Sequence, residues 1–186
     1  MLTRKNLEDY FKDKQVLLVG NSVKLCQSNS NGDFIDSFPI VCRINKGVAS
    51  LGTPWYGKKC DVFFYASLVS IPKKMKKSIY DSHNPIWVKT SKHNSFMAHD
   101  KNYNIPLDEW RHLKIEKLKI TEKKIEPTTG MVAIDFILSC NPKKLTLIGF
   151  DWKKSPTFYD LNRTYEPHDY SKEESYIRSF EKVHIV

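Results

Sequence analysis

The sequence of 186 residues has few cysteines and few glycines, and each scarcity excludes a class of protein. The four cysteines form no Cys-x-x-Cys pair and no histidine cluster accompanies them at zinc-ligand spacing, which excludes a zinc finger and a redox-active dithiol. We interpret them as mostly buried thiols in a reducing compartment. The seven glycines form neither the Gly-x-Gly-x-x-Gly of dinucleotide-binding folds nor the Gly-Lys-Ser/Thr of a P-loop.

Long apolar runs are absent as well. The first 14 residues alternate charges with isolated apolar side chains, so they contain neither the apolar stretch of a signal peptide nor one of membrane length. We therefore expect a chain without an anchor or an export signal, and hence a cytoplasmic protein.

Acidic residues are outnumbered by basic ones, 21 to 30, which gives a net charge of +9. Such an excess favours polyanionic or phosphorylated partners. Much of it lies in residues 73–77 and 114–124, where no interleaved aromatic residues could stack on exposed bases. A solvated lysine-rich face is the favoured interpretation, and a nucleic-acid-binding surface is the alternative.

Length and composition predict one domain over residues 1–186. Hydrophobic residues make up 40% of the chain and charged residues 27%, as in a folded protein and unlike a linker. Short runs rich in β-branched or aromatic residues predict buried strands at residues 16–19, 40–44, 61–65, 86–89 and 145–149.

Helical patterns lie between and after these runs. Apolar residues at spacings of three predict a helix from residue 107, and a nearly all-apolar segment predicts a buried helix over residues 130–140. Residues 113–120 fit either type of element, and we expect a helix followed by a strand. Ser171 and Glu174 match a capping box, which predicts a last helix over residues 172–184.

Strands that alternate with helices predict an α/β protein with a Rossmann-like, mostly parallel twisted sheet flanked by helices. Ligands of such sheets bind at the carboxyl ends of the strands. In this chain Gly20, Asn45, Tyr65 and Gly149 would emerge at that edge.

The first candidate site is the turn after the first strand. Gly20 lets the backbone pass close to a phosphate or ribose, while Asn21 and Ser22 add neutral hydrogen-bond donors. Taken alone, the segment fits a plain strand-to-loop turn equally well. An Arg43-x-Asn45 pair follows one element later.

The second candidate site is the start of the buried helix. Thr128, Thr129 and Gly130 place hydroxyls and bare amides at a helix N-terminus, which binds anions or nucleotides without a cationic side chain. An ordinary helix cap is the alternative for this segment alone.

The third candidate is His168, with Glu173 five residues later. It precedes a capped helix, whose positive end favours the uncharged imidazole that a general base requires, and a loop position leaves it accessible. The other five histidines have no such context.

Taken in order, residues 16–45, 127–152 and 168–173 resemble the large, small and very short motifs of eukaryotic-type sialyltransferases, glycosyltransferase family 29. The shared features are Gly-Asn-Ser with a closing Arg-x-Asn, Pro-Thr-Thr-Gly before an apolar helix, and His-x4-Glu. The resemblance implies the GT-A variant of the α/β fold and a donor in which cytidine monophosphate (CMP) activates an acidic sugar.

The resemblance also implies roles for residues. The matching asparagines of the family help to hold CMP, and the matching histidine is the general base of an inverting transfer. His168 would thus be the base, and Glu173 would orient the imidazole or the local helix. The implied donor-binding residues are Gly20, Asn21, Ser22, Asn45, Thr128, Thr129, Gly130 and Gly149.

The chain departs from the family in two places. No histidine occurs in residues 153–167, where the family usually has one that helps to bind the donor phosphate, so Tyr159, Arg163 or Tyr165 would substitute. The family's cystine lacks its first partner here, because Cys140 matches only the second, and we expect no disulfide.

A divalent-metal Asp-x-Asp motif is missing. Asp33 and Asp36 are too widely spaced, and Asp151 offers a single carboxylate before Trp152. We expect no bound metal and no cofactor, with the CMP-sugar as a substrate.

The sequence therefore predicts an inverting, metal-independent transferase that moves sialic acid from a CMP donor to a glycan hydroxyl. A transferase of 3-deoxy-manno-octulosonic acid (Kdo), whose donor has the same nucleotide, is the nearer alternative. A non-catalytic nucleotide- or nucleic-acid-binding module is the more distant one. The candidate loops for acceptor contacts are residues 91–104 and 153–164, and their sequences do not identify the acceptor.

Overall fold

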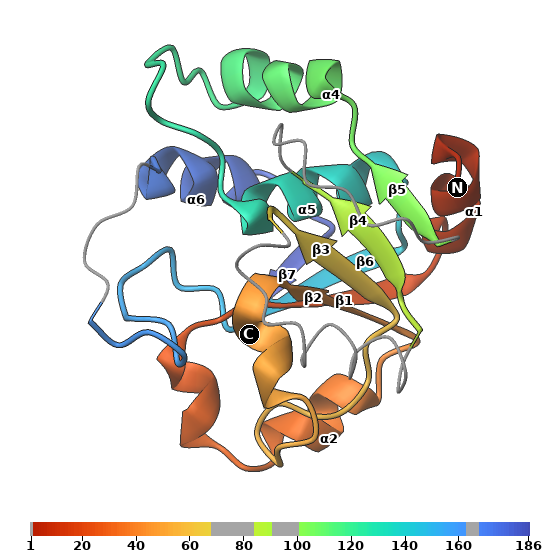
Figure 1. Cartoon of the computed structure of the whole chain (residues 1–186), viewed down its shortest axis with the longest axis vertical. Coiled ribbons are helices and arrows are strands. Elements are labelled where there is room, and N and C mark those ends of the chain that lie inside the picture. Colours follow the sequence, from red (N-terminus) through yellow and green to blue (C-terminus); the bar gives the residue numbers. More distant parts are fainter. Residues whose placement is uncertain (1, 68–83, 91–100, 163–167) are drawn as a thin grey trace.

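A computed structural model of the chain describes residues 2–67, 84–90, 101–162 and 168–186 (Figure 1). Its strands are β1 (Gln15–Val19), β2 (Ile40–Ile44), β3 (Val62–Tyr65), β4 (Ile86–Lys89), β5 (Asn102–Asn104), β6 (Lys144–Ile148) and β7 (Val183–Ile185). Its α-helices are α1 (Arg4–Phe11), α2 (Asn31–Asp36), α4 (Leu107–His112), α5 (Thr129–Ser139) and α6 (Tyr170–Arg178). Shorter 3-10 turns cover Val23–Gln27 and Asn45–Ser50.

Within these residues the strands form one parallel sheet in the order β5-β4-β3-β2-β1-β6-β7. The order reverses between β1 and β6, because the chain builds outward from β1 to β5 and then returns to the other side of β1. This arrangement confirms the predicted α/β, Rossmann-like class. The five predicted strands are present within one residue of their expected ends.

The sheet is covered on both faces, and alternate residues of a strand serve different layers. Val16 and Leu18 of β1 pack in a core with α1, α5 and α6. Their neighbours Leu17 and Val19 face a second core built with α2 and the 3-10 turn before it. Figure 1 shows α5 and α6 on one side of the sheet and α2 on the other. Burial on both faces explains why these strands are mostly apolar, with Arg43 of β2 as a buried exception.

Helix α5 is the central helix of the first layer. Thr128 caps its start, since the Thr128 hydroxyl accepts a hydrogen bond from the Met131 amide at 2.9 Å. Its end is marked by Asn141 in a left-handed conformation, with φ of 52°, and Pro142 follows and cannot continue the helix.

The C-terminal segment differs from the prediction. The last helix ends at Arg178 instead of residue 184, because the chain after it forms β7, which pairs with the edge of β6. The predicted capping box is also wrong. Asp169 is the N-cap and accepts from the Lys172 amide at 3.1 Å, while the Glu174 carboxylate pairs with Lys154 at 2.9 Å. Three further elements, α1, α2 and β5, were not predicted.

Residues 113–120 form no strand. A π-helical turn, Leu113–Lys117, continues α4, and Lys119 then takes a left-handed φ of 52°. Leu118 and Ile120 are buried in the core with α5, whereas Ile115 is 48% exposed. Leu118 and Ile120 are thus apolar because they pack in the core with α5, and not because they belong to a strand.

All four cysteines are free thiols, in agreement with the expected absence of a disulfide. Cys42, Cys60 and Cys140 are buried, and burial raises the pKa of Cys60 to about 12 and that of Cys140 to about 11. Cys26 is exposed. Among the helices of the described ranges, none has the length and apolar character needed to cross a membrane.

The packing of α5 on the sheet generates a test of stability. Phe136 is 2% exposed and contacts Phe64 and Tyr103, so we expect Phe136→Ala to lower the free energy of unfolding by about 3–5 kcal/mol. Leu161, which is 62% exposed, is the control, and Leu161→Ala should change stability by less than about 0.5 kcal/mol. Urea unfolding measures both. Equal effects of the two variants would show that α5 does not carry the core.

Candidate functional site

A cavity of about 250 Å³ lies at the carboxyl ends of β1, β2 and β6, where the strand order reverses. Ligands of open α/β sheets bind at this type of position. The cavity brings together turns from both halves of the sheet with the starts of α5 and α6. All ten predicted site residues line it: Gly20, Asn21, Ser22, Asn45, Thr128, Thr129, Gly130, Gly149, His168 and Glu173.

The floor of the cavity depends on two glycines in contact. A Cβ atom on Gly20 would lie 2.3 Å from the carbonyl oxygen of Gly149, closer than any side chain tolerates. Gly149 itself has a left-handed φ of 73°. The Ser22 amide donates to the same Gly149 carbonyl at 3.1 Å and joins the turn after β1 to the turn after β6.

Asn21 and Ser22 play different parts. Asn21 is nine-tenths buried, and its Nδ2 donates to the Ile44 carbonyl at 3.4 Å, while its Oδ1 has no hydrogen-bond partner within the described chain. The Ser22 hydroxyl instead belongs to a cluster with Asp151, at 3.0 Å, and Ser155, at 2.9 Å. Ser22 therefore ties the loop after β6 to the cavity wall.

Asn45 joins three elements at the cavity. It has a left-handed φ of 46° at the end of β2, a conformation that asparagine tolerates better than most residues. Its Nδ2 donates to the Thr129 hydroxyl at 3.0 Å, and its Oδ1 accepts from the Ala66 amide at 3.0 Å. The Asn45 amide thus connects the start of α5 with the ends of β2 and β3.

The start of α5 is held by a buried carboxylate. Glu173 is 3% exposed, and its two oxygens accept from the Thr128 amide and the Thr128 hydroxyl, each at 2.7 Å. The Thr128 hydroxyl in turn caps α5 at Met131. The first amides of an α-helix have no partner within the helix, so Thr129 and Gly130 present donors at a positive helix end.

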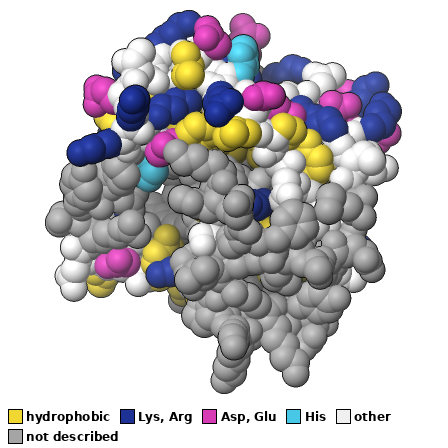
Figure 2. Space-filling model, turned by 45° about the horizontal axis from the view of Figure 1, so that its top comes forward, with side chains coloured by type: hydrophobic (Ala, Val, Ile, Leu, Met, Phe, Trp, Pro, Cys, Tyr) yellow, Lys and Arg dark blue, Asp and Glu magenta, His cyan; other side chains and the backbone are white. Residues whose placement is uncertain are grey.

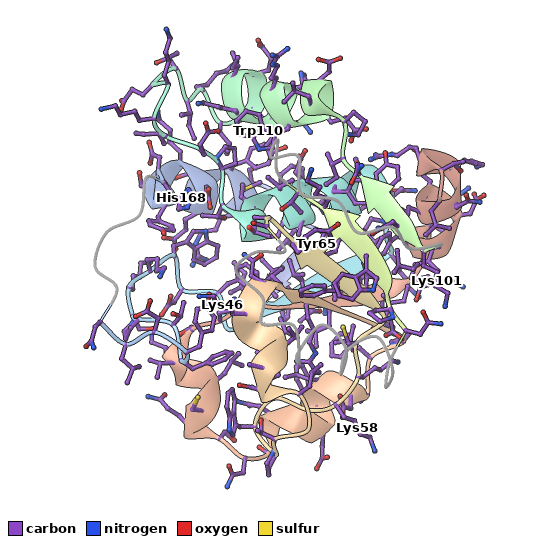
Figure 3. All side chains as sticks on the ribbon, viewed as in Figure 1. Lys46, Lys58, Tyr65, Lys101, Trp110 and His168 are labelled. Atoms are coloured by element: carbon purple, nitrogen blue, oxygen red, sulfur yellow. The ribbon has the colours of Figure 1, made fainter. Side chains whose placement is uncertain are left out.

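His168 lies just before α6, on the side of the sheet's carboxyl edge (Figure 3). Its Nδ1 lies 2.5 Å from the carbonyl oxygen of Glu126. A carbonyl only accepts, so Nδ1 carries a proton, and a ring with this single proton has its lone pair at Nε2. This is the tautomer that a general base at Nε2 requires, and the imidazole lines the cavity.

Further lining residues were not predicted as part of the site. They come from the loop directly after β6, residues 150–157, and include Asp151, Trp152, Lys153 and Ser155. Trp152 and Lys153 both have left-handed φ values, 49° and 61°. The position of this loop at the reversal of strand order was the available signal. Of the predicted phosphate-binding substitutes, Tyr159 lines the cavity, whereas Arg163 and Tyr165 lie outside the described residues.

The carboxylates considered as metal ligands have other partners. Asp36 accepts hydrogen bonds from the backbone amides of Lys58 and Lys59, at 2.8–3.0 Å. Asp151 accepts from Ser22 and Ser155. In the described ranges, no group of three or more His, Cys, Asp or Glu side chains could hold a metal ion.

The lysine-rich stretch at residues 114–124 carries acidic partners. Lys117 pairs with Asp135 at 2.7 Å, and Lys114 lies 3.8 Å from Glu126. In the upper part of Figure 2, Lys and Arg side chains lie among those of Asp and Glu. The mixture of signs favours a solvated charged face over a nucleic-acid-binding surface. The other basic stretch, residues 73–77, lies outside the described residues.

Comparisons with known proteins identify the fold. No family model matches the sequence, and no curated protein matches it. The structure is similar to a mammalian sialyltransferase in complex with Gal-beta-1-3GalNAc-ortho-nitrophenol, with a TM-score of 0.65, 16% identity, and coverage of 96% of this chain and 71% of that chain. It is also similar to a variant of the sialyltransferase Cst-II in complex with CMP, with a TM-score of 0.64, 16% identity, and coverage of 92% and 80%.

A third similar structure is the monofunctional alpha-2,3-sialyltransferase Cst-I from Campylobacter jejuni, with a TM-score of 0.61, 15% identity, and coverage of 100% of this chain and 77% of that chain. Mammalian and bacterial sialyltransferases thus share one fold with this chain, although few residues are identical. The fold is that of the sialyltransferases, as the sequence motifs led us to expect.

The contact between the turns generates a test at the cavity floor. Gly20→Ala places a Cβ against the backbone of Gly149, which cannot move aside, so we expect a loss of about 2 kcal/mol or more in the free energy of unfolding. Gly130→Ala is the matched control. Its Cβ would lie 2.8 Å from the edge of the Phe150 ring, which can turn, and alanine stiffens the unfolded chain in compensation. Urea unfolding should therefore rank Gly20→Ala as the more damaging change, and the reverse ranking would contradict this geometry.

Proposed function

We propose that this chain is an inverting, metal-independent glycosyltransferase that moves sialic acid from a CMP-sugar donor to a glycan hydroxyl, with residues 1–186 acting as one catalytic domain. The observation that carries the proposal is the convergence of three separated motifs on one cavity at the reversal of strand order. The similar structure of Cst-II contains CMP, and another structure of CstII from Campylobacter jejuni contains the substrate analogue CMP-3FNeuAc.

The cavity has suitable groups for the nucleotide. Asn21 and Asn45 lie at the ends of β1 and β2, and the start of α5 supplies the Thr129 hydroxyl and backbone donors. Neutral donors and a positive helix end bind an anionic nucleotide without a metal.

The proposed transfer needs one proton acceptor. The acceptor hydroxyl oxygen attacks the anomeric carbon from the face opposite the nucleotide, and the bond from this carbon to the phosphate oxygen breaks. Its electron pair leaves with CMP, and the hydroxyl proton passes to Nε2 of His168. The Glu126 carbonyl fixes the tautomer and stabilises the imidazolium that forms, since it holds the proton on Nδ1.

Glu173 acts in this proposal as a positioning residue. Its carboxylate is engaged with Thr128, so it fixes the start of α5 relative to α6, and His168 directly precedes α6. The relative position of the nucleotide donors and the base is therefore set through one buried carboxylate. This role corresponds to the predicted orientation of the local helix.

Binding of CMP is the first test. We expect calorimetry to detect one CMP per chain, and Asn45→Gly, which keeps the left-handed backbone but removes the amide, to weaken CMP about 3- to 10-fold. Asn84→Gly is the matched control, because Asn84 also has a positive φ, 41°, and is exposed. CMP affinity should be unchanged in that variant. A wild-type protein that does not bind CMP but binds DNA or RNA would contradict the proposal.

Loss of the base is the second test. His168→Ala should reduce the transfer rate about 10²- to 10⁴-fold and leave CMP affinity within about threefold, because the imidazole acts on the acceptor proton. His112→Ala, at the exposed end of α4, is the control and should retain full activity. Assays with CMP-sialic acid and CMP-Kdo, each with and without a chelator, identify the sugar. Full transfer by a folded His168→Ala protein would exclude the proposed base, and loss of transfer on chelation would exclude metal independence.

A further inference from the structure

Among the charged residues that line the cavity, acidic residues outnumber basic ones. Asp151 and Glu173 contribute carboxylates, while a CMP-sugar of the proposed class carries a phosphate and a sugar carboxylate. Within the described residues, Lys153 is the one Lys or Arg among those that line the cavity. A cation at this cavity adds to the attraction that the helix N-terminus and the neutral donors exert on an anionic ligand, since charges at short range interact strongly in a partly enclosed site.

The backbone at Lys153 is held in an unusual conformation. Trp152 and Lys153 are consecutive left-handed residues, with φ of 49° and 61°, and neither is glycine. Each such residue costs roughly 1–3 kcal/mol and persists where surrounding contacts enforce it, most often at functional sites. Here the guanidinium carbon of Arg178 lies 5.4 Å from the centre of the Trp152 ring. The Lys154 amide also donates a hydrogen bond to the Asp151 carbonyl at 3.1 Å, which closes the turn.

Lys153 and Lys154 are adjacent in this turn but have different surroundings. Lys154 points to α6, where its Nζ pairs with the Glu174 carboxylate at 2.9 Å and its side chain is 63% exposed. Lys153 lines the cavity and is half-buried. The loop start is fixed from the opposite side, because Asp151 accepts hydrogen bonds from Ser22 and Ser155. The strained turn thus separates the cavity lysine from the surface lysine.

We propose that Lys153 binds the phosphate of the CMP-sugar and stabilises the charge that develops on it during transfer. This inference rests on the proposed function. As the bond between the anomeric carbon and the phosphate oxygen breaks, the electron pair stays on that oxygen and the phosphate gains a negative charge. The ammonium of Lys153 neutralises this charge on the side of β6, while His168 takes the acceptor proton near α6. A lysine ammonium suits phosphate as a compact point charge.

The test compares CMP with cytidine, which lacks the phosphate. Calorimetry of the wild-type protein should give a higher affinity for CMP than for cytidine. Lys153→Met keeps an unbranched side chain at the same backbone position, and it should reduce the ratio of the two affinities about tenfold or more. Lys154→Met is the matched control and should leave the ratio within about twofold. Lys153→Arg retains the charge and should preserve most of the preference for CMP.

Transfer assays add a second readout. Lys153→Met should lower kcat about 10²- to 10³-fold, as expected when one group that stabilises developing charge is removed. Circular dichroism establishes folding, and Lys153→Gln replaces Lys153→Met if the latter does not fold.

A wild-type protein that binds neither CMP nor cytidine overturns the proposed function and this inference with it. A wild-type protein that prefers CMP, together with an unchanged preference in Lys153→Met, overturns this inference alone. A loss of the preference in Tyr159→Phe instead would assign the phosphate to Tyr159.

Discussion

The structure depends on the contact between the turns that follow β1 and β6. These two strands are adjacent in the sheet but far apart in sequence, and their turns meet so closely that Gly20 has no room for a side chain. The contact forms the floor of the cavity at the reversal of strand order. Because backbone packs on backbone here, the shape of the floor does not depend on side-chain rotamers.

A second constraint links the two helices that start at the cavity. The Glu173 carboxylate is buried, and a buried carboxylate is tolerated only where donors satisfy it. Thr128 provides both donors, so the start of α5 is joined directly to the first turn of α6. Hydrogen bonds of 2.7 Å therefore connect the start of α5 with α6, which His168 directly precedes. The sequence pattern alone suggested only that this glutamate orients the helix or the imidazole.

The sequence predicted most of the sheet, and the ten candidate site residues it singled out all line the cavity, while its failures have physical causes. The five longer strands are apolar on both faces, which is a strong signal, whereas β5 and β7 are three-residue edge strands whose pairing is set by their neighbours. The predicted site residues follow strands or begin helices, so topology alone brings them together. Lys153 was named only as part of a candidate acceptor loop, because its place at the cavity depends on two left-handed residues in the loop after β6, and no local pattern encodes that conformation.

The distribution of the cysteines has a practical consequence. Thiolates are the reactive form, and burial disfavours them at Cys42, Cys60 and Cys140, which also lie out of reach of solvent. Only the surface thiol of Cys26 is open to an alkylating reagent in the folded protein. The number of labelled sulfurs per chain then rises from one to four as the chain unfolds, so mass spectrometry of alkylated protein counts unfolded molecules without an engineered cysteine.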